Sequence, residues 1–133
     1  MKIKVEKASG VTLDWLVAKC EGFTDYDPDT EKMLPPRKED GWVNLYEYPY
    51  STRWSLGGPI IELEGIDLYC NVPFGIAQKY KDWTTSWRAR YCRCGCGTEM
   101  MHGPTPLIAA MRCYVALKLG EEAEVPDELL NQL

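Results

Sequence analysis

The sequence lacks several features that define large classes of proteins. No apolar run approaches the roughly 20 residues of a membrane span, so a membrane protein is not expected. The N-terminus has no apolar stretch typical of a secretory signal, and we therefore expect a cytoplasmic protein. Positive charge is scarce, because 15 Lys and Arg stand against 20 Asp and Glu for a net charge of −5. An extended nucleic-acid surface would need a basic stripe, so none is expected.

Histidine is nearly absent. A Ser/His/Asp or Cys/His catalytic site would have to use His102, the one histidine of the chain. The sequence contains no G-x-S-x-G nucleophile elbow and neither of the glycine-rich phosphate-binding fingerprints. No catalytic residue can be assigned, and the balance favours a protein that is not an enzyme, although the sequence leaves that question open.

The 133 residues suit one domain that spans residues 1–133. Hydrophobic patterns predict an α+β fold, a small antiparallel sheet packed with helices. Predicted strands lie at residues 2–6, 42–46, 66–70 and 83–92. Predicted helices lie at residues 13–21 behind a Thr12 cap, from residue 51 or 52 with an interruption at Gly57-Gly58-Pro59, at 107–119, and briefly after Pro126. Prolines and charges predict a long loop at residues 23–41.

The clearest local signal is the helix that opens at Gly103-Pro104-Thr105-Pro106. Thr105 suits the N-cap and Pro106 the first helical position, and Gly120 suits the end. The residues between them carry two charges and are otherwise almost entirely apolar, which predicts a central, buried helix.

A cysteine cluster raises the question of metal binding. Cys92, Cys94 and Cys96 are followed by His102, and thiolates with one imidazole form a typical zinc ligand set. The spacing is C-x-C-x-C rather than the paired C-x-x-C of structural zinc sites. Reduced thiols in a glycine-rich turn are therefore the favoured interpretation. A zinc-binding protein or a small zinc-dependent enzyme is the alternative, and no other cofactor is expected.

Basic and aromatic residues suggest a ligand site. Arg88 and Arg90 share the polar face of the strand predicted at 83–92, and the helix capped by Thr105 follows closely, with free backbone N–H groups. Together with the rings of Tyr50 and Trp54, they could form a pocket for a small anion or a nucleotide. The competing interpretation is a solvated strand face with ordinary aromatic packing.

Three segments carry a family resemblance. They are Leu13-Asp14-Trp15-Leu16-Val17-Ala18-Lys19-Cys20-Glu21-Gly22, then Tyr50-Ser51-Thr52-Arg53-Trp54 with Gly57-Gly58-Pro59-Ile60-Ile61-Glu62, and Gly103-Pro104-Thr105-Pro106-Leu107-Ile108-Ala109-Ala110-Met111-Arg112-Cys113-Tyr114-Val115-Ala116. The chain resembles the NinX-like family of small accessory proteins of tailed lambdoid phages, which is similar to phage α-β-α sandwich domain proteins. The resemblance implies a sheet flanked by helices and transfers no catalytic residues.

The resemblance implies a functional class. We expect an accessory early phage protein in the host cytoplasm, a non-enzymatic binder that modulates host physiology or defence. Its partner would be a host protein or a small anionic, nucleotide-like ligand that it sequesters. The zinc-binding alternative stays open. So does an oligomer-forming interaction protein, because the chain has five Trp and eight Tyr, residues enriched at interfaces.

Overall fold

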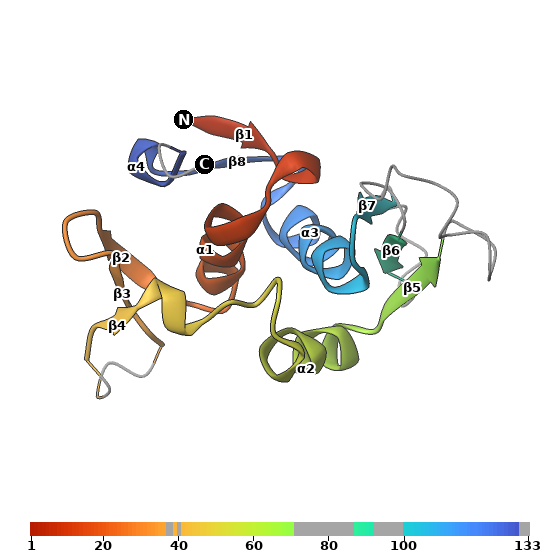
Figure 1. Ribbon diagram of the computed structural model, residues 1–133, viewed down its shortest axis with the longest axis horizontal. Coiled ribbons are helices and arrows are strands. Elements are labelled where there is room, and N and C mark those ends of the chain that lie inside the picture. Colours follow the sequence, from red (N-terminus) through yellow and green to blue (C-terminus); the bar gives the residue numbers. More distant parts are fainter. Residues whose placement is uncertain (37–38, 40, 71–86, 92–99, 131–133) are drawn as a thin grey trace.

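Helices and short antiparallel strands alternate along the chain (Figure 1). The computed structural model describes residues 1–36, 39, 41–70, 87–91 and 100–130. Within these residues the helices are α1 (Gly10–Cys20), α2 (Trp54–Glu64), α3 (Pro106–Leu119) and α4 (Asp127–Leu130). The strands form three small antiparallel sheets, so the predicted α+β class is confirmed. None of the helices described is long and apolar enough to cross a membrane.

Helix α3 lies at the centre of the fold, as predicted. It packs against α1, against α2 and against one three-stranded sheet (Figure 1). Thr105 caps it, because its Oγ1 accepts a hydrogen bond from the backbone N–H of Ile108 at 3.1 Å. Gly120 ends it with a φ of 92°, a conformation that favours glycine. Most of its side chains are buried, and they form the middle of the hydrophobic core.

The sheet beneath α3 contains β5 (Ile66–Cys70), β6 (Trp87–Tyr91) and β7 (Met101–Gly103), in that order. The strand predicted at 66–70 is confirmed, and so is the part of 83–92 that β6 covers; residues 83–86 and 92 lie outside the described residues. Gly103 permits the close packing of α3, because an added Cβ would lie 2.7 Å from the backbone nitrogen of Ala109.

Two predictions about the first helices were wrong. The N-cap of α1 is Ser9, whereas Thr12 lies inside the helix and is only 1% exposed. Helix α2 is continuous through Gly57-Gly58-Pro59, where a break was predicted, and it ends at the left-handed Gly65 as expected. The continuity has a steric reason. Residues before proline avoid the helical region partly because of their Cβ atom, and Gly58 has none.

The predicted loop at residues 23–41 contains two strands, β2 (Thr24–Asp27) and β3 (Lys32–Leu34), which correct that prediction. They form a sheet with β4 (Val43–Asn44) in the order β2-β3-β4. The strand predicted at 42–46 is therefore shorter than expected, and its second half is the 3-10 helix η3 (Leu45–Glu47). The local sequence pattern did not reveal these strands, because each strand depends on its neighbours for hydrogen bonds.

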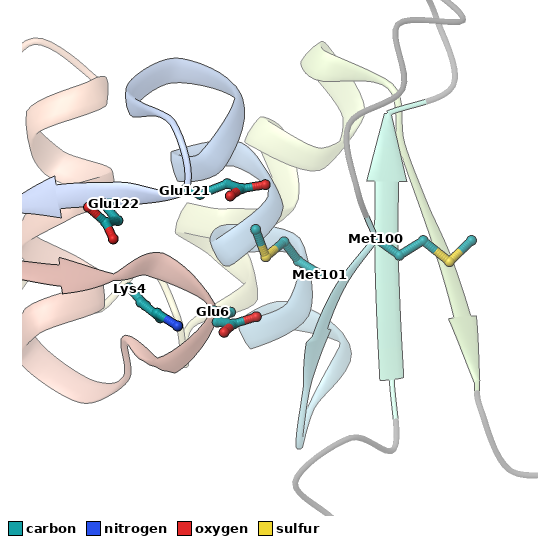
Figure 2. Close-up of a pocket in the computed structure, with 6 residues that line it drawn as sticks. All are labelled: Lys4, Glu6, Met100, Met101, Glu121 and Glu122. Atoms are coloured by element: carbon teal, nitrogen blue, oxygen red, sulfur yellow. The ribbon is translucent and has the colours of Figure 1, made fainter.

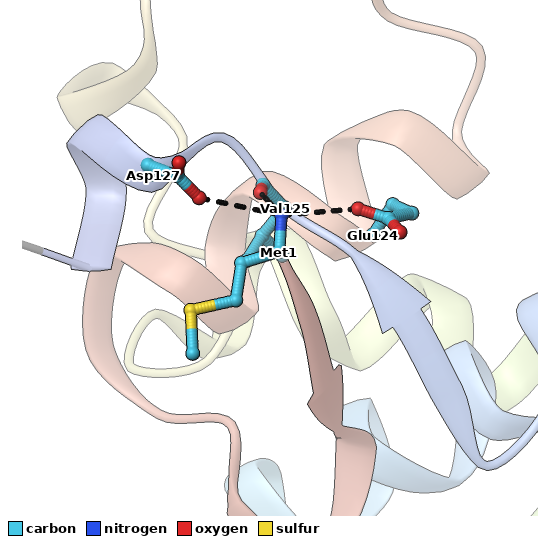
Figure 3. A network of polar contacts seen from close by, with 4 residues as sticks. All are labelled: Met1, Glu124, Val125 and Asp127. Carbon is cyan, nitrogen blue, oxygen red and sulfur yellow. Dashed lines mark hydrogen bonds and ion pairs between the residues drawn. The ribbon is translucent and has the colours of Figure 1, made fainter.

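The two ends of the chain meet in the third sheet. Strand β1 (Lys2–Lys4) pairs with β8 (Glu122–Glu124), and β1 is followed by the 3-10 helix η1 (Val5–Lys7), which shortens the strand predicted at 2–6. The N-terminal ammonium group of Met1 contacts Glu124 at 3.0 Å and Asp127 at 3.3 Å (Figure 3). The hydrogen bond to Glu124 is the main reason why the pKa of this amine is raised.

Candidate functional site

The outer surface of the β5–β6–β7 sheet carries two arginines. Successive side chains of a strand point to opposite faces, and Ala89 and Tyr91 of β6 are buried on the side of α3. Arg88 and Arg90 therefore project from the other face and share it, as the alternation of the sequence predicts. Arg90 is exposed and Arg88 is half-buried.

A tyrosine from the neighbouring strand joins the two arginines. In the antiparallel register Tyr69 lies opposite Arg88, and Asp67 lies opposite Arg90. Each guanidinium carbon lies 5.3 Å from the centre of the Tyr69 ring, within the range of a cation–π interaction. We call these four residues, Asp67, Tyr69, Arg88 and Arg90, the arginine face.

The hydrogen bonds of the arginine face are incompletely satisfied. The Tyr69 hydroxyl donates to Asp67 Oδ2 at 3.3 Å, but no carboxylate among the described residues forms an ion pair with either arginine. The Nε of Arg88 is buried and has no hydrogen-bond partner in the described part of the chain. Two positive charges lie next to one aromatic ring, and this combination can bind an anion that has a flat, stackable part.

The other predicted ligand residues lie elsewhere. Tyr50 is only 7% exposed and stacks on Tyr48, with 6.2 Å between the ring centres. Its backbone oxygen lies close to Gly57, beside α3, and Thr105 caps α3 itself. Both residues thus lie on the α3 side of the sheet, whereas Arg88 and Arg90 lie on the opposite face. Trp54 is exposed at the first position of α2.

A groove beside η1 was not predicted from the sequence. It has a volume of about 590 Å³, and it lies between η1, the start of α1 and the segment from β7 into α3. Its lining residues are Glu6, Lys7, Ser9, Met100, Met101, His102, Pro104 and Arg112. A smaller neighbouring cavity shares Glu6, Met100 and Met101, and its other lining residues are Lys4 of β1 with Glu121 and Glu122 near the start of β8 (Figure 2).

Arg112 is the unusual residue of this groove. It is 9% exposed, and its Nε and Nη1 donate to the backbone oxygens of Ala8 at 2.8 Å and His102 at 2.7 Å. Burial lowers the pKa of Arg112, while the negative charge of Glu6 opposes this effect. Among the described residues no carboxylate lies within ion-pair distance of it. Arg112 therefore ties α3 to η1 and β7, and it places a positive charge beside the groove that only the more distant Glu6 offsets among the described residues.

A comparison with known protein families shows to which family the chain belongs. The model of the family described as "Bacteriophage P22, NinX" matches residues 4–118. The chain belongs to the NinX family. The match covers the arginine face and all the lining residues of the η1 groove, and it ends before β8 and α4. No curated protein matches the chain.

The cysteines of this NinX-family chain fall into two groups. Cys92, Cys94 and Cys96 lie outside the described residues, so the predicted zinc site stays a prediction. Its fourth member, His102, is exposed on β7 and lies opposite Arg88 in the register. Among the residues described, no three His, Cys, Asp or Glu side chains gather as a metal site.

Two described cysteines are poor nucleophiles. Burial raises the pKa of the Cys113 thiol to about 12, and it is the main cause of a similar value, about 12, for Cys20. Since the thiolate is the reactive form, both side chains stay protonated near neutral pH and act as core residues. Cys70 departs from the core pattern because it is exposed at the end of β5.

Proposed function

We propose that this NinX-family protein acts by binding rather than by catalysis, inside the host cell and in its cytoplasm, and that the arginine face binds a nucleotide-like anion. The observation that carries the proposal is the arrangement of Arg88 and Arg90 around the ring of Tyr69. The guanidinium groups would hold phosphate oxygens, and the ring would support a base. Sequestration of such a ligand would modulate a nucleotide signal of host physiology or defence.

The unpaired Nε of Arg88 supports this assignment. A buried donor without a partner costs free energy that a hydrogen bond to a ligand would recover. The ring supports it in a different way. Tyr69 replaces Tyr50 and Trp54 as the stacking residue, because it is the tyrosine that both arginines contact.

The test is ligand-induced thermal stabilisation with a panel of ribonucleoside phosphates and cyclic dinucleotides. A ligand present at about 100 times its Kd stabilises a protein by about 2.7 kcal/mol, which is easily measured. We expect a member of the panel to stabilise the parent protein, and the double variant Arg88→Ala with Arg90→Ala to lose that stabilisation. Arg53→Ala is the matched control, because Arg53 is exposed before α2 and away from this sheet.

Three further variants test the aromatic ring and separate the charge of the arginines from the geometry of their donors. Tyr69→Phe keeps the ring and should retain binding, whereas Tyr69→Leu removes the stacking surface and should weaken it. Replacing both arginines by lysine keeps the charge but removes the planar forked donors, and should also weaken binding. An unchanged melting shift in the double alanine variant would contradict the proposal.

A further inference from the structure

A separate pocket lies at the beginning of α1. It has a volume of about 290 Å³ and lies between β1, η1, the first turn of α1 and α4. Its polar lining residues are Lys4, Lys7, Ser9 and Thr12, and its apolar lining residues are Ile3, Ala8 and Leu130. Among the described residues, the lining includes two cationic side chains and no acidic one.

The N-terminus of α1 points to an anionic ligand. The first N–H groups of a helix have no intrahelical partner and carry partial positive charge. At α3 the side chain of Thr105 caps this end, but at α1 the side chain of Ser9 makes no capping hydrogen bond. The backbone at Ser9 is extended, with a φ of −151° and a ψ of 170°, and its side chain lines the pocket.

Thr12 provides an independent sign of a ligand. Its side chain is 1% exposed and also lines the pocket. Its hydroxyl has no hydrogen-bond partner among the described residues. Most buried polar groups in folded proteins are paired, and an unpaired one costs about 1–3 kcal/mol. A ligand oxygen in the pocket would provide the missing partner.

The charges around the pocket favour an anion. Lys7 is exposed on η1 and forms no ion pair with any described residue, whereas Lys4 lies opposite Glu122 in the β1–β8 register. Glu6, the acidic residue of η1, lines the neighbouring η1 groove rather than this pocket. Behind the pocket, buried Arg112 donates to the backbone oxygen of Ala8 and adds a further positive charge.

We propose that this pocket binds a small organic oxyanion. Its phosphate or carboxylate head would accept hydrogen bonds from the first turn of α1 and from Thr12, and Lys7 would neutralise its charge. Its apolar body would rest on Ile3, Ala8 and Leu130. A volume of about 290 Å³ is near the lower limit of ligand pockets, so the ligand is compact, and the site is distinct from the arginine face.

The experiment measures thermal stabilisation by four probes at constant ionic strength, with sodium chloride as the reference. Inorganic phosphate and acetate test the head group alone, and phenyl phosphate and phenylacetate add an apolar body. We expect the larger probe of one pair to stabilise the parent protein more than its small counterpart. The better pair identifies the head group as phosphate or carboxylate. No stabilisation by any probe beyond that of chloride overturns the proposal.

Two variants test the assignment of the residues. Thr12→Val keeps the shape and removes the hydroxyl, so the ligand-free melting temperature should stay the same or rise. The affinity for the best probe should nevertheless fall at least about tenfold, because a hydrogen bond to a charged group is lost. Lys7→Met should also weaken binding, and the matched control Lys2→Met should not, because Lys2 lies on β1 outside the pocket. Unchanged affinity in both Thr12→Val and Lys7→Met would refute the proposal.

The two sites can be tested independently. The double alanine variant at Arg88 and Arg90 should retain the response to the small oxyanions, and Lys7→Met should retain the response to nucleotides. Failure of one proposal would therefore leave the result for the other intact.

Discussion

Asp14 offers a sharp test of how the helices are held together. It lies on α1, is 8% exposed, and its Oδ1 accepts a hydrogen bond from the backbone N–H of Ser51 at 2.8 Å. This contact joins α1 to the segment that leads into α2. Asp14→Ala leaves the buried N–H without a partner, so the free energy of unfolding should fall by about 1–3 kcal/mol. Asp14→Asn keeps an acceptor oxygen and removes a buried charge, so it should stay within about 1 kcal/mol of the parent at pH 7.

The burial of Asp14 also predicts how the relative stability of Asp14→Asn depends on pH. Burial raises the pKa of Asp14 above its ordinary value of 3.8, although hydrogen bonding from Ser51 partly opposes this shift. A carboxyl group whose pKa is higher in the folded state contributes most stability at low pH, and it loses that contribution as the pH rises through the folded pKa. The stability of Asp14→Asn relative to the parent should therefore increase upward from about pH 4 and then level off.

Urea unfolding followed by tryptophan fluorescence, at a series of pH values from 4 to 7, measures both effects. Equal stability of Asp14→Ala and Asp14→Asn at pH 7 would refute the role of the Ser51 hydrogen bond. A relative stability of Asp14→Asn that falls as the pH rises would refute the direction of the pKa shift.

Three other predictions follow from the packing, the capping and the burial of single residues. Gly103→Ala should lower the free energy of unfolding by about 1–3 kcal/mol in urea titrations, because its Cβ would lie 2.7 Å from the backbone nitrogen of Ala109. An unchanged free energy of unfolding would show that α3 can shift away from β7 without cost. Thr105→Ala should cost about 1 kcal/mol in the same titrations through the lost cap to Ile108, while Thr105→Ser should cost little, and equal losses would exclude capping as the cause. Peptide mapping after alkylation at pH 8 should show Cys113 modified far more slowly in the native protein than in urea, since its pKa is about 12; equal rates would contradict its burial.

The sequence predicted the elements whose signals are local. The cap at Thr105, the apolar helix behind it and the stop at Gly120 lie within one short segment, and α3 has the expected bounds. The break predicted at Gly57-Gly58-Pro59 failed for a local reason as well. Glycine and proline each disfavour a helix, but glycine directly before proline removes part of the clash that proline causes.

Elements that depend on distant partners were not predicted. The acidic segment Glu122–Glu124 has no strand signal of its own, and it becomes β8 because β1 lies beside it. The arginines of the candidate site were identified from the alternation of β6, but their aromatic neighbour was not. Which tyrosine lies next to Arg88 depends on the pairing of β5 with β6, and the sequence around the arginines does not contain that information. The pocket at α1 could not be predicted for the same reason, because it combines Ile3 with Leu130 from the other end of the sequence.

The pairing of β1 with β8 has a consequence for the order of folding. The contact between Met1 and Glu124 spans 123 positions of sequence, so its closure costs more chain entropy than the pairing of β5 with β6 or the docking of α3 on that sheet. During synthesis β1 must wait for nearly the whole chain before it can pair. The pocket at α1 takes Ile3 from one end and Leu130 from the other, so it is completed only in that late step. A ligand held there would keep the two ends from separating, and its binding would report a fully assembled chain.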